Sequence, residues 1–333
     1  GSAALAKAAM NAVGLGDLTD SPASEGAPSK PEPQPSQDET PRAPTATDTP
    51  QSGREDSPDP GDVQILMPEA GQYAYGTRDW AETLFKGAKT DPWGHDWRAS
   101  QRARYVAAMG LVNHQLNGTP VANVLDIGCC LGDFTAELAD RFNACEVLGV
   151  DISEEAVRKC SGRFESDPRL RFEQAALPEL AVSRDGFDFV SALEVIYYVG
   201  TPERIEQSLR RIHELMEPGG WLLISSCLNR PPFRTAEPFE EMVSRHFTVV
   251  DRTLRYHGLY SSQETLVRQS MQAAKMLAGA VSAAGKAAVD EYLQAGVKLL
   301  GNVDLVEDLH DYARRSMGAK GMSHAIVLAR KDR

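Results

Sequence analysis

Short apolar runs alternate with amphipathic segments through the middle of the chain. Five apolar runs have the length of buried strands and lie near 122–127, 146–151, 169–174, 187–193 and 220–226. Three segments between them repeat apolar residues every three or four positions and predict helices near 131–142, 153–165 and 202–216. This alternation predicts an α/β fold, with a parallel sheet covered by helices on both faces.

Two further apolar runs, near 247–257 and 323–330, predict a sixth and a seventh strand. The residues between them are rich in alanine and have the spacing of helices, the second and third near 286–300 and 303–315. We expect this insertion, residues 261–320, to leave the sheet at the edge where ligands bind and to form a helical lid over the ligand-binding crevice. A dimerisation arm is the alternative.

The first 62 residues differ in composition from the rest. Ten of the twenty prolines lie between Ser21 and Pro60, and that stretch has no aromatic residue. Such a composition cannot bury enough apolar surface to offset the entropy of ordering, so we expect a short helix and a disordered linker over 1–62. The segment is either a connection to neighbouring domains of a larger protein or an ordinary tail. We expect an N-terminal helical cap at 63–118, and a core at 119–260 and 321–333.

Charge and cysteine content exclude several classes of protein. The formal net charge is −12, of which −7 falls in residues 1–62, and the mildly acidic remainder argues against nucleic-acid binding. No uncharged apolar stretch approaches the ~20 residues that a membrane span needs. The five cysteines lack the spacing of a disulfide framework or a metal site, which favours reduced thiols in the cytoplasm. We therefore expect no metal, membrane or nucleic-acid partner.

The most informative motif follows the first predicted strand. Asp126 ends that strand, Gly128 and Gly132 allow a tight turn, and a helix follows. Asp151 ends the second strand, where a carboxylate is placed to accept both hydroxyls of a ribose. A dinucleotide site needs a glycine at the position of Cys130 and a helix start without an acid, so an NAD(P) oxidoreductase is a remote alternative.

The Asp126–Gly132 motif resembles motif I of class I S-adenosylmethionine-dependent methyltransferases. Asp151, Phe187–Val199 and Met216–Ile224 match later motifs of that family in the expected order. The resemblance implies a Rossmann-like sheet of seven strands, with the seventh antiparallel, and S-adenosyl-L-methionine as the cofactor.

Within this family, the chain resembles the NodS-like group, whose members N-methylate the amino sugar of a chitooligosaccharide signal. The shared elements are the turn Ile127–Thr135, the segment Glu194–Tyr198, and Asp91-Pro-Trp93 ahead of an arginine-bearing helix, 98–105. This likeness spans about 80–230.

The resemblance also implies residues that bind the cofactor. Asp126 would face the ammonium group of the methionine part. Either Arg102 or Arg104 could bind its carboxylate, since an arginine fork matches that geometry; an exposed helix face is the alternative. The acid that often contacts the adenine amino group after the third strand is missing. Only main-chain atoms of Ala176 and Leu177 would contact the adenine there. The remaining cofactor candidates lie in the same turns: Gly128, Cys129, Cys130, Gly132, Asp151, Ile152 and Leu193.

Catalytic candidates follow from the same edge of the sheet. Glu194, Tyr197 and Tyr198 follow the fourth strand, and His257 ends the sixth. Glu194 either accepts the acceptor's proton, binds an acceptor ammonium, or holds the cofactor's amino end or a neighbouring loop.

These features predict a methyltransferase that acts on an amine or hydroxyl of a small molecule. The acceptor would be a sugar or an intermediate of natural-product biosynthesis. It would contain a sugar or be attached to a carrier. The alternative is a non-catalytic S-adenosylmethionine-binding scaffold or regulatory domain, supported by the linker and the altered motif at Cys130.

Overall fold

The computed structural model describes residues 74–86, 91–143, 146–228, 231–256, 258–278 and 281–332. The short helix and linker expected over 1–62 lie outside these ranges. Among the described helices, none has both the length and the apolar character that crossing a membrane requires.

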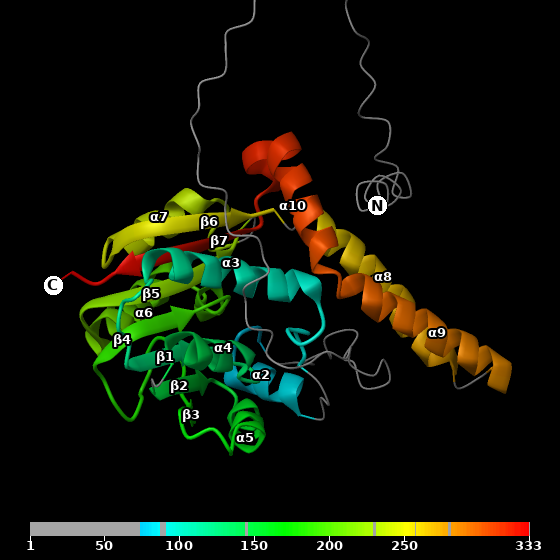
Figure 1. Ribbon diagram of the computed structural model, residues 1–333, viewed down its shortest axis with the longest axis horizontal. Coiled ribbons are helices and arrows are strands. Elements are labelled where there is room, and N and C mark those ends of the chain that lie inside the picture. The colour runs from blue at the N-terminus through cyan, green and yellow to red at the C-terminus, as the bar shows by residue number, and fades with distance from the viewer. Residues whose placement is uncertain are drawn as a thin grey trace, which may run out of the picture. The chain divides into compact units, whose positions relative to one another are not determined.

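Seven strands form one sheet in the order β3-β2-β1-β4-β5-β7-β6 (Figure 1). Only β7 is antiparallel to its neighbours, β5 and β6. Both the order and the reversed strand confirm the expected α/β methyltransferase-type sheet. The strands are β1 Asn123–Ile127, β2 Glu146–Asp151, β3 Leu170–Gln174, β4 Phe187–Ala192, β5 Met216–Cys227, β6 Thr248–Arg255 and β7 His324–Arg330.

Alternate residues of the central strands enter two separate cores, one on each face of the sheet. Leu125 and Ile127 of β1 pack into the core that α6 (Pro202–Leu215) and α7 (Ala236–Ser244) cover. Val124 packs into the core that α3 (Ala99–Gln115) and α4 (Asp133–Phe142) cover. This two-residue period explains why the strands read as continuous apolar runs.

The start of β5 differs from its expected position near residue 220. Helix α6 begins as expected, with Thr201 accepting a hydrogen bond from the Arg204 amide (3.4 Å) and Pro202 in its first turn. It ends at Leu215, and Met216 pairs directly with Phe187 before the register between β4 and β5 shifts. The Glu-Pro-Gly-Gly stretch therefore lies within the strand, because pairing with β4 overrides its turn-forming composition.

Helices α2 (Arg78–Phe85) and α3 precede the sheet in the chain. Glu82 of α2 accepts hydrogen bonds from the Ser153 hydroxyl (3.1 Å) and the Glu154 and Glu155 amides, where α5 (Glu154–Arg163) begins. A carboxylate there satisfies amide groups that have no partner within the helix. This contact attaches α2 to the sheet domain.

Three helices lie between β6 and β7 in the chain: α8 (Gly258–Leu277), α9 (Ala283–Leu300) and α10 (Val303–Met317). They pack against the region where α3 begins, through Trp97 with Met271 and Val297, and through Ala103 with Val306. Figure 1 shows α8 and α9 extending beyond that end of α3. The described residues also include the short 3₁₀ helices η2 (Ile196–Val199) and η4 (Gly318–Gly321).

Candidate active site

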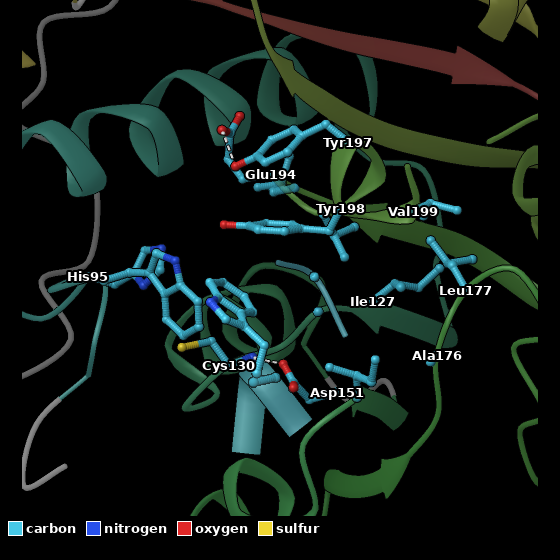
Figure 2. A pocket seen from close by; sticks show the side chains of 18 of the residues that line it. His95, Ile127, Cys130, Asp151, Ala176, Leu177, Glu194, Tyr197, Tyr198 and Val199 are labelled. Carbon is cyan, nitrogen blue, oxygen red and sulfur yellow. Dashed lines mark hydrogen bonds between the residues drawn. The ribbon is translucent and has the colours of Figure 1, made fainter. Parts of the chain in front are cut away.

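A cavity lies at the carboxyl ends of β1, β2 and β4, where the strand order reverses (Figure 2). Ligands bind at this position in open α/β sheets because the loops on either side diverge there. Most of the expected site residues line it, namely Arg104, Gly128, Cys130, Asp151, Ile152, Ala176, Leu177, Leu193, Glu194, Tyr197 and Tyr198.

The loop after β1 is held close to β2. The amides of Gly128 and Cys129 both donate to the Val150 carbonyl, at 2.8 and 3.0 Å. Gly128 has φ of 75°, and a Cβ there would lie 3.0 Å from the side chain of Val195. The glycine therefore serves both the turn and the close approach of the loop after β4.

Asp151 points its carboxylate toward this loop. One oxygen accepts from the Cys130 amide (3.1 Å) and the other from the Ser153 amide (2.9 Å). Burial raises the pKa of Asp151 to about 6, against the lowering effect of those two amides. Each carboxylate oxygen has lone-pair capacity left, so the group can accept hydrogen bonds from a diol in the cavity.

Three expected cofactor residues do not line the cavity. The oxygens of Asp126 accept from the hydroxyls of Ser191 and Thr135, both at 2.6 Å, and burial raises its pKa. Its side chain joins β1 to β4 and α4 instead of facing a ligand ammonium. Cys129 is buried, and a Cβ at Gly132 would lie 2.7 Å from the ring of Phe164, so packing explains both positions.

Glu194 lies in a buried polar cluster beside the cavity. Its carboxylate accepts from the hydroxyls of Ser225 (2.8 Å) and Tyr197 (3.3 Å) and lies 3.4 Å from His324 Nε2. Arg104 Nη1 is 3.1 Å from the same His324 nitrogen. Burial alone would raise the pKa of Glu194, but the charges of His324 and Arg104 and these hydrogen bonds lower it overall. An ionised carboxylate of this kind is better suited to binding a cation than to removing a proton.

Aromatic rings cover the middle of the cavity. Tyr198 lies between Tyr197, Tyr75 and Trp80, with ring centroids 4.6, 4.9 and 5.6 Å away. In Figure 2 its hydroxyl points toward the end of the cavity that His95 occupies, and Ala176, Leu177 and Val199 lie at the opposite end. Burial raises the pKa of Tyr197 well above its usual value, so this hydroxyl stays protonated.

The N-terminal segment contributes residues that the sequence interpretation did not assign to the site. Eight of them line the cavity, five of which have ring side chains: Gly76, Trp80, Ala81, Phe85, Trp93, His95, Gln101 and Tyr105. The Asp91-Pro-Trp93 motif was the signal that could have identified this segment, because its own Trp93 and the nearby His95 and Tyr105 line the cavity.

Two expectations have a different outcome. His257 lies outside the described residues. None of the described residues of α8, α9 and α10 lines the cavity, so the role of the insertion as a lid stays a prediction.

Residues 124–220 match the family model of the methyltransferase domain. This stretch includes β1 to β4 and the beginning of β5, and therefore the strands that border the cavity. Residues 124–220 form a class I methyltransferase domain. The expected family is thereby confirmed.

Relatives of known function share parts of this domain. Nodulation protein S of Rhizobium tropici is 27% identical over 140 residues, covering 42% of this chain and 56% of that protein. Trans-aconitate 2-methyltransferase of Deinococcus radiodurans is 36% identical over 110 residues, covering 33% of this chain and 40% of that protein. The chain thus spans about half the length of these curated relatives. The resemblance to the NodS-like group agrees with the first match.

Among solved structures, the N-methyltransferase NodS from Bradyrhizobium japonicum WM9, in complex with S-adenosyl-L-homocysteine, is similar to this chain with a TM-score of 0.47. The two share 16% sequence identity, and the match covers 73% of this chain and 93% of that one.

The residues of the cavity fit S-adenosyl-L-methionine, the cofactor that the family implies. Asp151 suits the ribose diol, and Ile152 and Leu177 offer apolar surface for a flat base. Glu194 and Arg104 provide opposite charges for the ammonium and carboxylate of an amino acid. In this donor set Glu194 offers the carboxylate, which is one of the roles expected for it, whereas Asp126 does not line the cavity.

Proposed function

We propose that this chain is an S-adenosylmethionine-dependent methyltransferase that acts on an amine or hydroxyl of a small molecule. The observation that carries the proposal is one cavity in a methyltransferase domain that combines the buried Asp151 with the Glu194–Arg104 pair. A diol and a zwitterion are both present in S-adenosylmethionine, and these groups are complementary to them.

In this proposal the side chains bind and orient, because methyl transfer depends mainly on the alignment of the two reacting atoms. Asp151 holds the ribose, and Glu194 with Arg104 holds the amino-acid end. The rings of Tyr198, Trp80 and Trp93 exclude water and favour a positively charged centre in the cavity. S-adenosylmethionine, when bound, supplies the activated methyl group.

The match to nodulation protein S favours an amine on a sugar-containing acceptor, free or carrier-bound, as for a natural-product intermediate. We place the protein in the cytoplasm, because the five cysteines lack the spacing of a disulfide framework, which suits a reducing compartment. We also propose that residues 1–62 connect this enzyme to neighbouring domains.

Titration calorimetry with S-adenosylhomocysteine, with NADH as the comparison, tests the cofactor. We expect micromolar binding of the first and none of the second. Transfer of labelled methyl from S-adenosylmethionine to partially deacetylated chitooligosaccharides and to a panel of small amines and alcohols tests the reaction. Binding without transfer to any of them would favour the scaffold alternative.

A further inference from the structure

Asp91 and His95 form a hydrogen-bonded pair at the cavity. The Asp91 carboxylate accepts from the amides of Trp93 (2.8 Å) and His95 (3.0 Å), and it contacts His95 Nδ1 directly. Asp91 is 1% exposed. The His95 side chain is 13% exposed, and this residue lines the cavity. The aspartate is thus the buried partner, and the imidazole is the group that a ligand can reach.

Two features fix the orientation of the His95 ring. It stacks on the ring of Tyr105, with centroids 5.2 Å apart and planes 2° from parallel. Burial would raise the pKa of Asp91, but His95 and the two amides together lower it to about 2. Asp91 is therefore ionised at any working pH and accepts a hydrogen bond from the Nδ1–H group. In the neutral ring this leaves Nε2 as the unprotonated nitrogen.

Nε2 has no hydrogen-bond partner among the described residues. Figure 2 shows His95 at the end of the cavity toward which the Tyr198 hydroxyl points, away from Ala176 and Leu177. If the apolar end holds the base of the cofactor, an acceptor molecule approaches from the end where His95 lies.

We propose that His95 is the general base that takes the acceptor's proton, and that Asp91 is the residue that positions it. This inference rests on the proposed function. The acceptor's lone pair forms the new bond to the methyl carbon as the carbon–sulfur bond breaks, and that bond's electron pair stays on sulfur. The proton of the acceptor N–H or O–H goes to Nε2, and Asp91 stabilises the resulting imidazolium before the proton passes to solvent.

The surroundings of the ring suit this role. The titratable groups around it are Asp91 and Asp96 from its own loop, Tyr105 from α3 and Cys130 from the loop after β1. Burial raises the pKa of both Tyr105 and Cys130 well above their usual values, so both are neutral, and the ionised neighbour is a carboxylate. Negative charge beside the ring stabilises the imidazolium that proton transfer creates.

A bound metal is the alternative use of this cluster, because ligand atoms of Asp91, His95 and Cys130 lie within 4.8 Å of one another. The contacts oppose it. Asp91 already accepts from two amides, from His95 and from the Cys130 thiol (3.3 Å), which occupies its lone pairs.

Nitrogen-detected NMR on the protein with S-adenosylhomocysteine bound tests the state of the ring directly. In the neutral ring of His95 we expect a proton on Nδ1 and none on Nε2. The signals are assigned to His95 by their loss in His95→Gln. The opposite tautomer would overturn the proposal. So would a signal shift on addition of stoichiometric zinc that EDTA reverses, because it would show the cluster to be a metal site.

Initial rates against pH, with the chitooligosaccharide as acceptor, test the chemistry. We expect His95→Gln to lower kcat by about 10² or more, to remove the acidic limb of the profile, and to change the Kd of S-adenosylhomocysteine by less than about twofold. Asp91→Asn should also lower kcat. In His95→Gln, added imidazole should restore part of the rate. The matched control is His114→Gln, an exposed histidine on α3, which should keep the wild-type rate and profile.

Other outcomes separate the two proposals. A wild-type rate and profile in His95→Gln would overturn the base and leave the methyltransferase intact. An equal loss of cofactor affinity and rate would overturn it too, because His95 would then serve cofactor binding. Failure of the wild-type protein to bind S-adenosylhomocysteine would overturn the proposed function, and this inference with it.

Discussion

Two residues bordering the cavity, Cys130 and Glu194, adopt left-handed backbone conformations with φ of 55° and 57°. Neither is a glycine, so each conformation costs of order 1–3 kcal/mol and persists only where the surroundings hold it. The amide of Cys130 donates to Asp151, and that of Glu194 donates to the Ser225 hydroxyl (2.8 Å). The strain therefore lies where a tightly turned backbone presents side chains to the cavity.

Asp151→Ala should weaken S-adenosylhomocysteine binding. Each ribose hydrogen bond to a charged acceptor contributes about 1.5–3 kcal/mol, so the Kd should rise at least tenfold for each bond lost. Calorimetry checks this, with the exposed Asp185→Ala as the matched control that should keep wild-type affinity. Unchanged affinity in a folded Asp151→Ala protein would contradict the cofactor assignment.

The same carboxylate predicts a pH dependence. The pKa of Asp151 is about 6 in the folded protein, so the group gains a proton as the pH falls through that value and can then accept fewer hydrogen bonds. Affinity for S-adenosylhomocysteine should be constant above pH 7 and decrease below about 6. In Asp151→Asn the affinity should be low at every pH and lack this step. A step of equal size in the asparagine variant would assign it to another group.

At the scale of elements, the contact between α3 and α8 depends on a buried charged cluster. Arg98 donates to Glu264 and to the Trp93 carbonyl (2.6 Å), and the Ser100 hydroxyl donates to Glu264 (2.7 Å). The Glu264 side chain is 1% exposed and that of Arg98 is 13% exposed. Residues 166 positions apart are thus joined in a site with little solvent.

Glu264→Ala should destabilise the protein by about 3–5 kcal/mol, because it leaves Arg98 buried without its carboxylate. Chemical denaturation measures this. Glu264→Gln keeps the shape and one acceptor oxygen and should lose less. Asp311→Ala is the matched control on α10 and should change stability little, since this carboxylate is 52% exposed and its partner Arg314 is 56% exposed. A loss below 1 kcal/mol for Glu264→Ala would show that the cluster is open to water.

At the scale of the whole folded unit, the described residues of the insertion pack against the chain around Trp97 and Ala103, and none of them lines the cavity. Trp97 packs against α8 and α9, and His95 and Arg104 line the cavity from either side of it along the chain. Any effect of the insertion on the site therefore acts through α3 and the loop before it.

Replacing Gln263–Arg315 by a short glycine-containing turn tests the lid. If the insertion is a lid, kcat should fall by about 10² while cofactor affinity changes little, because positional slack of about 1 Å slows methyl transfer. The variant should also lose stability, since removing α8 and α9 would expose the buried side chain of Trp97. Sedimentation and initial rates are the measurements. A monomer with full activity, from a dimeric parent, would identify a dimerisation arm instead.

The local sequence pattern was sufficient to predict the strands of a parallel sheet, the place of the cavity and the three helices of the insertion, whereas the reversed seventh strand was implied by the family resemblance and the strand order came from the structure. Period-two burial and glycine turns are properties of neighbouring residues, so they can be read from the chain. Asp151 and Glu194 were identified for the same reason, since a residue at the end of a parallel strand always reaches that edge of the sheet.

The partners of these residues could not be read in this way. Asp126 stands at the motif position of a ligand-binding acid, yet its side chain bonds to the hydroxyls of Ser191 and Thr135 and does not line the cavity. His95 resembled an ordinary histidine of the N-terminal segment until folding placed it beside Asp91 at the cavity. Which atoms remain available to a ligand depends on contacts between distant segments, and only the tertiary structure decides those.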